Sequence, residues 1–303
     1  MNSIHLTPVQ ERSPGIGEIT ALLLPELGLR YSLRAQRLRH LAAEHAMGDY
    51  LRFVARIADV QQQLLDSAPL PAALKASLAA RLEHPGAPLA GNADLSEPYW
   101  QELLRHLCEA LYIDSSPTIR ATLDAVTALD AAALHAKAQA LLAGRFAEVD
   151  SGQALFIWAA LALYFTQLAA HLPASAKACV GEHRQHCPVC ASTPVASLIM
   201  SGAQAGLPYP HRGLRESRWH MLRVKCSNCE ATGNLDYWSL EQHNAAAKAE
   251  SCGDCHSYLK VFYPEHDSAL ELVADDLASL ALDGEVERQG FARSGLNPFL
   301  FPG

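Results

Sequence analysis

Apolar residues recur every three or four positions through most of the first half of the chain, which is the spacing of helices with one buried face. Gly48 and Asp49 are typical of a helix end followed by an N-cap, and a clear apolar stripe follows them. This stripe contains Tyr50, Phe53, Val54, Ile57, Val60 and Leu64. Further helices are predicted over residues 71–82, 98–111, 117–126 and 131–143. We therefore predict an all-helical domain over residues 1–172.

A central stretch, residues 154–165, contains no charged side chain and is long enough to suggest a membrane span. It is rich in alanine, is bordered by Gln153, Thr166 and Gln167, and has no basic residues at its flanks. A helix that is surrounded by other helices fits these features better. The pattern thus predicts a buried central helix and no insertion into a membrane.

The hydrophobic pattern changes after the helical domain. Proline, serine and glycine mark residues 173–186 as a linker, and short apolar strands then predict two small β modules, over residues 187–224 and 225–264. In residues 265–303 we expect a returning helix, capped by Asp267, and an apolar tail that docks into a groove of the protein. The predicted fold class is α+β, with an all-helical domain, two tandem rubredoxin-like or zinc-ribbon-like modules and a C-terminal helix.

Three Cys-x-x-Cys pairs lie within the two β modules. Two thiolates at this spacing on one turn point toward one cation, and two such turns complete a tetrahedral site. The second module holds four cysteines in this arrangement, with 22 residues between the pairs: Cys226, Cys229, Cys252 and Cys255. The paired spacing favours metal binding over free thiols or disulfides. We predict one firm site there, and four thiolates accept either iron or zinc.

An internal repeat relates the two modules. The segment that starts at Cys187 aligns with the segment that starts at Cys226, so that Cys187 and Cys190 form the first turn of the earlier copy. The second turn of that copy falls at Arg212 and Arg215, where the later copy has cysteines. Arginine stays protonated and has only hydrogen-bond donors, so it cannot ligate a metal ion.

Two interpretations of the first module stay open. In one, Cys187 and Cys190 hold an ion with the help of nearby histidines, since imidazole also binds zinc and iron. The candidate substitute ligands are His183, His186, His211 and His220. In the other, the module binds no metal and its fold depends on packing, although small ribbons rarely fold without their ion.

The charge balance limits the classes of partner. The formal net charge is −8, and only residues 183–263 carry more basic than acidic side chains, 8 against 6. This excess is too small to favour a nucleic-acid-binding protein. The N-terminus shows no basic segment followed by an apolar one, so no secretory signal is visible. Cysteines grouped as metal turns, without an export signal, predict a reducing cytoplasm.

No residue pattern predicts a catalytic site. The sequence contains no phosphate-binding glycine loop, no nucleophile elbow and no His-x-x-x-His helix. A closed shell of four thiolates also leaves no open position for water. We therefore expect a binding protein and not an enzyme.

Several longer strings of residues point to one known family. They are RVKCSNC (223–229), YWSL (237–240), KAESCGDC (248–255), VADDLASL (273–280) and NPFLFPG (297–303), with RLRHLA (37–42) and GDYLRF (48–53) in the helical half. In these strings the chain resembles the formate dehydrogenase accessory protein family, FdhE. The resemblance is densest over residues 187–303.

The resemblance implies a cytoplasmic, non-catalytic factor that is needed for active respiratory formate dehydrogenase. Members of the family it resembles contact the catalytic subunit of that enzyme before its export, and bind iron through rubredoxin-like cysteine turns. The usual pattern of the family has four Cys-x-x-Cys pairs, and this chain matches three of them. The pair that it lacks falls at Arg212 and Arg215, the positions that the internal repeat also singles out.

The expected function is therefore binding of the catalytic subunit of formate dehydrogenase during its maturation, by a ribbon domain that a metal stabilises. A rubredoxin-like electron carrier or an iron-delivery protein is the alternative, and a carrier requires an accessible metal with a tuned potential. The sequence does not distinguish iron from zinc, because both accept four thiolates in a tetrahedron.

Overall fold

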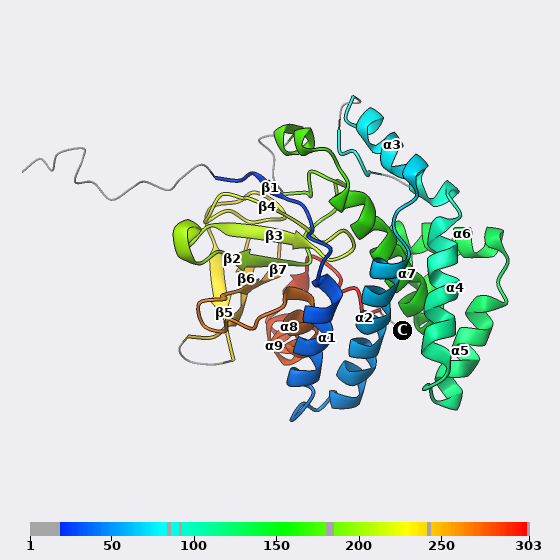
Figure 1. The fold of residues 1–303 in the computed structure, drawn as a ribbon. Coiled ribbons are helices and arrows are strands. Elements are labelled where there is room, and N and C mark those ends of the chain that lie inside the picture. The colour runs from blue at the N-terminus through cyan, green and yellow to red at the C-terminus, as the bar shows by residue number, and fades with distance from the viewer. Residues whose placement is uncertain (1–18, 84–85, 91–92, 180–184, 241–243, 302–303) are drawn as a thin grey trace, which may run out of the picture.

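The computed structural model describes residues 19–83, 86–90, 93–179, 185–240 and 244–301. A bundle of helices from the first half of the chain lies beside a twisted sheet from the second half (Figure 1). The strand-rich half also carries the Cys-x-x-Cys turns, and two short helices follow it. The predicted α+β fold class is therefore confirmed.

The helical half agrees closely with the periodicity of the sequence. Its elements are α1 (Arg30–Leu41), α2 (Gly48–Ser67), α3 (Ala72–Arg81), η2 (Ala93–Ser96), α4 (Tyr99–Tyr112), α5 (Pro117–Thr127), α6 (Ala131–Leu142), η3 (Phe146–Glu148), α7 (Ser151–Ala170) and η4 (Ala174–Cys179), where η marks a 3₁₀ turn. Helices α5, α6 and α7 are capped at their N-termini by Ser116, Asp130 and Asp150, whose side chains accept hydrogen bonds from the backbone N–H three positions later. Ser and Asp are preferred caps because they satisfy otherwise unpaired N–H groups.

Helix α7 is the centre of the helical domain and packs against α2, α4, α5 and α6 (Figure 1). Among the described helices it is the one long and apolar enough to cross a membrane, yet 89% of its most apolar window is buried inside the protein. The neighbouring helices thus cover the surface that a bilayer would otherwise cover. The predicted buried central helix is confirmed.

The described strands form one sheet. They are β1 (Leu22–Leu23), β2 (Ala196–Ile199), β3 (Pro208–Arg212), β4 (Ser217–Trp219), β5 (Leu235–Trp238), β6 (Ala247–Cys252), β7 (Ser257–Phe262) and β8 (Ala292–Arg293), with the 3₁₀ turn η5 (Gly202–Gln204) between β2 and β3. Their order is β1-β4-β3-β2-β7-β6-β5, with β8 beside β7. Each module contributes an antiparallel meander, and the two meanders join where β2 and β7 pair in parallel, with Ala196 opposite Lys260.

The C-terminal segment forms two short helices, α8 (Leu272–Ala278) and α9 (Leu280–Arg288). The sequence pattern predicted a single helix capped by Asp267, whereas the side chain of Glu271 caps α8. The two helices are separated at Ser279, whose hydroxyl accepts a hydrogen bond from the buried ammonium group of Lys260 in β7. The same ammonium group donates a hydrogen bond to the backbone carbonyl of Asp276. This carbonyl at the end of α8 therefore has a partner without a further turn of helix.

Alternate residues along the strands divide the sheet into two faces. One face packs against α8 and α9 through two small apolar clusters, one of which includes Phe262 and Leu272 and the other Tyr258 and Leu282. The opposite face borders a cleft that is lined in part by Val261.

The C-terminal tail docks onto the helical domain, as predicted, over the residues that the structure describes. Phe299 is buried, and its carbonyl accepts a hydrogen bond from the hydroxyl of Tyr50. The ring centroid of Phe301 lies 5.6 Å from that of Trp158, in an edge-to-face arrangement. Asn297 donates a hydrogen bond to the backbone of α8, so the tail connects the helical domain with the sheet-covering helices.

Candidate metal centre

The four cysteines of the second module bring their sulfur atoms within 4.8 Å of one another. Cys226 Sγ lies 3.8 Å from Cys255 Sγ, and Cys229 Sγ lies 3.7 Å from Cys252 Sγ. A disulfide holds its sulfurs about 2 Å apart, whereas a tetrahedral ion with bonds of about 2.3 Å to sulfur needs sulfurs about 3.8 Å apart. The donor set therefore fits a four-coordinate metal ion, which when bound would cross-link the two turns.

Backbone geometry directs the paired sulfurs toward one another. The residue that follows each pair donates its N–H to the carbonyl of the first cysteine, from Glu230 to Cys226 at 3.1 Å and from His256 to Cys252 at 2.9 Å. Glu230 and His256 have left-handed backbone, with φ of 65° and 54°. A non-glycine residue adopts this conformation at a cost of about 1–2 kcal/mol, so other contacts must hold the turns closed.

Burial and hydrogen bonding make the four thiols unequal. Burial raises the pKa of Cys226 to about 12. Burial also opposes ionisation of Cys255, but hydrogen bonds from Ser257 and Asn228 outweigh it and lower the pKa of Cys255 to about 6. A thiolate is thus present at neutral pH, and the charge of a bound ion would favour ionisation of the other three. Cys229 is exposed, so the site lies at the surface.

Cys187 and Cys190 lie apart from this site, on a turn that belongs to the main apolar core. Cys187 Sγ lies 3.2 Å from the hydroxyl of Ser217, and burial raises the pKa of Cys187 well above its usual value. A hydrogen bond from Cys187 and the nearby guanidinium groups of Arg215 and Arg212 hold the pKa of Cys190 well below its usual value, in spite of burial. The first pair therefore has arginines for neighbours in place of further ligands.

The three described histidines among the predicted substitute ligands lie in other surroundings. His186 is exposed on the surface. His211 is buried, and its Nε2 lies 3.5 Å from a carboxylate oxygen of Glu216. The ring of His220 packs edge-on against Tyr209, with the centroids 5.8 Å apart.

The structure does not assemble a complete ligand set around the first pair. Within the described part of the chain, Cys187 and Cys190 do not belong to any group of three His, Cys, Asp or Glu side chains close enough to share an ion. His183 lies outside the described residues. The second module holds the one such group that the described residues contain.

Comparison with known proteins gives the same family for three consecutive parts of the chain. Three family models match consecutive parts of it: FdhE N-terminal over residues 19–182, FdhE central domain over residues 186–223 and FdhE C-terminal domain over residues 224–300. The chain belongs to the FdhE family. The turns of the first module fall in the FdhE central domain, and the four clustered cysteines fall in the FdhE C-terminal domain.

Full-length FdhE relatives support this assignment. The Protein FdhE homolog of Edwardsiella ictaluri is 49% identical over 306 residues, which cover 99% of each chain. The Protein FdhE homolog of Pectobacterium carotovorum subsp. carotovorum is 46% identical, over 99% of this chain and 98% of the relative. The crystal structure of the FdhE protein from Pseudomonas aeruginosa matches with a TM-score of 0.84 and 35% identity, over 93% of this chain and 99% of that chain. The fold described above is thus the FdhE fold.

A cleft beside the cysteine site was not predicted from the sequence. It has a volume of about 580 Å³ and lies between the open face of the sheet and the segment 221–227 that precedes and enters the first cysteine turn. Leu222, Val224 and Tyr237 line it and are at least half exposed. One signal for this cleft was present in the sequence. Two apolar residues, Leu222 and Val224, lie just before Cys226 in a segment too short to form a core of its own.

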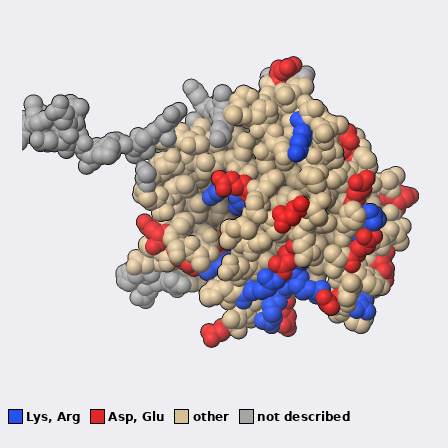
Figure 2. Space-filling view, in the orientation of Figure 1, with Lys and Arg blue, Asp and Glu red and all other residues tan. Residues whose placement is uncertain are grey.

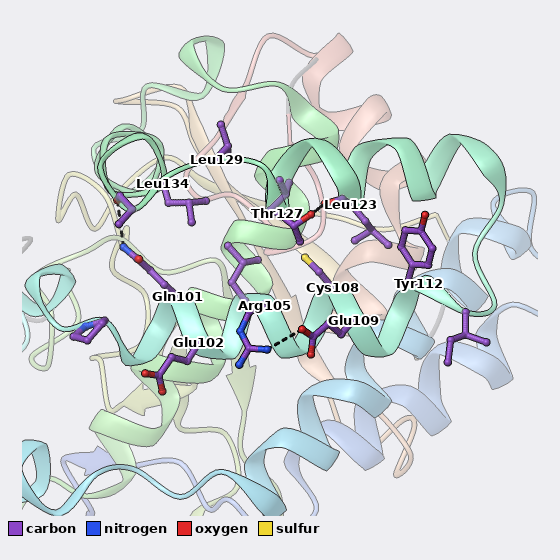
Figure 3. Close-up of a pocket in the computed structure, with 15 residues that line it drawn as sticks. Gln101, Glu102, Arg105, Cys108, Glu109, Tyr112, Leu123, Thr127, Leu129 and Leu134 are labelled. Atoms are coloured by element: carbon purple, nitrogen blue, oxygen red, sulfur yellow. Dashed lines mark hydrogen bonds and ion pairs between the residues drawn. The ribbon is translucent and has the colours of Figure 1, made fainter.

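A second hollow, of about 710 Å³, lies between α4, α5 and α6 (Figure 3). Its lining is mainly apolar, and an ion pair between Arg105 and Glu109 lies at its edge. Cys108 points toward it, and burial raises the pKa of Cys108 to about 12. This thiol therefore stays protonated at neutral pH and is a weak nucleophile.

Proposed function

We propose that the protein is a cytoplasmic, non-catalytic accessory factor that binds the catalytic subunit of a respiratory formate dehydrogenase during maturation. The observation that carries this proposal is the full-length match to the FdhE family, together with four sulfurs placed to hold an ion. In this proposal the metal shapes a docking surface and takes no part in turnover, because four thiolates leave it no open position.

The ion has a structural task in the second module. Residues 222–237 contribute no side chain to the apolar core clusters of the described chain, although they include the turn from Cys226 to Cys229. A segment with so little core of its own needs another source of order. A metal ion bound across both turns supplies it, because binding free energy then stabilises the folded form.

The docking surface that we propose is the cleft beside this turn. Leu222, Val224 and Tyr237, which line this cleft, are 64%, 59% and 50% exposed. Exposed apolar residues gathered in one place are typical of a protein-binding surface. On the face shown in Figure 2, basic and acidic side chains are interspersed with large uncharged areas, which suits a protein partner better than a polyanion.

The test is capture of the catalytic subunit of formate dehydrogenase by full-length protein. A variant with Cys252→Ala and Cys255→Ala is expected to lose most of the capture, because the turn beside the cleft loses its cross-link. Equal capture by the variant and the wild type would separate metal binding from partner binding and would contradict the proposal.

A matched pair of surface variants locates the contact. Leu222→Glu places a charge in the cleft and is expected to reduce capture at least tenfold. Ile113→Glu alters a residue that is 74% exposed and lines the hollow between α4 and α5, and it is expected to leave capture unchanged. The reverse result would place the contact on the helical domain.

A rubredoxin-like electron carrier or an iron-delivery protein is the second candidate, because exposed Cys229 brings the site to the surface. A carrier requires iron that is reduced and reoxidised by a partner. Reversible loss of the thiolate-to-iron absorption on reduction would favour it. Full capture activity of a colourless, zinc-loaded protein would instead favour the accessory role.

A further inference from the structure

The four turns of the two modules share one backbone geometry, although only three of them carry cysteines. In the first module, Ala191 donates its N–H to the carbonyl of Cys187 and Glu216 donates to that of Arg212, both at 2.7 Å. The equivalent bond closes both turns of the second module. All four closing residues have left-handed backbone: Ala191 (φ 58°), Glu216 (54°), Glu230 (65°) and His256 (54°). The segment from Arg212 to Arg215 therefore has the backbone of a metal-binding turn.

The two arginine side chains of this turn lie against the first cysteine pair and the helical domain. The guanidinium group of Arg212 is buried near the thiols of Cys190 and Cys187, and its charge interacts with both. The guanidinium group of Arg215 lies 4.2 Å from the ring centroid of Phe165 and donates to the carbonyl of Leu89 at 2.9 Å. Arg215 is only 3% exposed. Permanently charged residues thus occupy the two turn positions that correspond to Cys252 and Cys255.

These charges oppose a metal ion in the first module. Arg212 and Arg215 cannot lose a proton and cannot act as ligands. A cation between the two turns would face both guanidinium groups in a buried region, where repulsion is weakly screened. Cys187 and Cys190 alone supply at most half of a tetrahedral shell.

Packing replaces the cross-link that an ion provides in the second module. The N–H of Leu89 donates to the backbone of the first turn at 2.8 Å. A Cβ on Gly213 would lie 2.8 Å from the ring of Pro298, so the second turn contacts the C-terminal tail directly. Glu216, which closes that turn, pairs with Arg34 of α1 at 2.9 Å, and both side chains are buried.

We propose that the first module binds no metal ion. The guanidinium groups of Arg212 and Arg215 exclude a cation, and their contacts help to hold the turns together, as an ion would in the second module. Each chain then holds one ion, bound by the four cysteines of the second module. The first module keeps its fold when metal is scarce, and the second module responds to metal supply.

The test is the metal content of full-length protein after reconstitution with Co²⁺ or Zn²⁺ and removal of unbound ions. The wild type is expected to hold one ion per chain. The variant Cys187→Ser with Cys190→Ser keeps one ion, and Cys252→Ser with Cys255→Ser holds none. Two ions in the wild type, with one lost when Cys187 and Cys190 are replaced, would overturn the proposal, including the case in which His183 completes a site.

Restoring the missing cysteines provides a gain-of-function test. The variant Arg212→Cys with Arg215→Cys is expected to bind two ions and to double the cobalt–thiolate absorption per chain. A control with Arg218→Cys and Arg223→Cys, in the same module but outside the turns, stays at one ion. Binding of one ion by the restored variant would show that the arginines do not exclude the metal. If the restored variant does not fold, the serine variants above still decide the question.

Discussion

The two β modules hold the same pair of turns by different means. In the second module, four sulfur atoms lie within 4.8 Å of one another and fit one ion. In the first, Cys187 and Cys190 face Arg212 and Arg215, and the turns are enclosed by the helical domain and the tail. The backbone of the turns is nearly unchanged between the modules, so their geometry does not by itself require a metal.

Their surroundings explain the difference. Cys187, Val189, Cys190, Leu214 and Trp219 belong to the main apolar core, whereas none of the four clustered cysteines of the second module belongs to it. A ribbon that shares the core of a larger domain gains enough buried surface to stay folded. Residues 222–237 of the second module contribute nothing to the described apolar clusters, so this segment is expected to depend on an ion for its order. The first module can therefore have arginines in place of two cysteine ligands, because its turns are buried in the main core.

Metal removal is the largest expected perturbation and acts on one module. A chelator that strips the ion should expose amides of β5 and β6 to hydrogen exchange, because a structural zinc site contributes about 10–16 kcal/mol in small zinc-finger peptides. Amides of β3 and β4 should keep their protection. The measurement is hydrogen–deuterium exchange with and without chelator, followed by mass spectrometry. Equal loss of protection in both modules would contradict the comparison.

A matched pair of substitutions perturbs the first module more than the second. Glu216 and Glu230 each close a turn with left-handed backbone, one in either module, but Glu216 pairs with Arg34 in the interior, whereas Glu230 pairs with partly exposed Lys225. Glu216→Gln should lower the free energy of unfolding by about 3 kcal/mol, since it breaks a buried ion pair. Glu230→Gln should lower it by less than about 1 kcal/mol. Urea unfolding measures both, and equal losses would show that burial does not distinguish the two turns.

The smallest expected effect is a pH dependence that originates in the first module. Burial, with the charges of Arg218, Arg34 and Arg30, holds the pKa of His211 well below its usual value. The folded protein keeps this histidine neutral, whereas the unfolded chain takes up a proton below about pH 6.5. Stability is therefore lost as the pH falls below about 6.5, by up to about 1.4 kcal/mol per pH unit from this group.

Replacing the histidine removes that part of the acid sensitivity. His211→Gln should lose less stability than the wild type between about pH 7 and pH 5, as measured by urea unfolding at each pH. Identical losses in the two proteins would show that His211 becomes protonated without unfolding.

Local signals in the sequence predicted much of this protein. Three-to-four-residue periodicity predicted the helices, and in the structure the side chains of Ser116, Asp130 and Asp150 cap three of them, because both effects act over a few neighbouring residues. The spacing of the cysteines predicted the four-sulfur site, and the internal repeat identified Arg212 and Arg215 as the altered turn. Each of these inferences uses chemistry that is encoded within one turn or one helix.

Tertiary structure decided what depends on distant partners. The parallel pairing of β2 with β7 merges the two modules into one sheet, and Lys260 of β7 divides the C-terminal helix at Ser279. Neither contact leaves a local pattern, because its partners are separated by many residues of chain. The structural role of the arginines was hidden for the same reason. The sequence showed that Arg212 and Arg215 cannot bind a metal, but not which distant residues they contact. Only the folded chain brings Leu89 and Phe165 to Arg215, so that burial holds the turn in place of an ion.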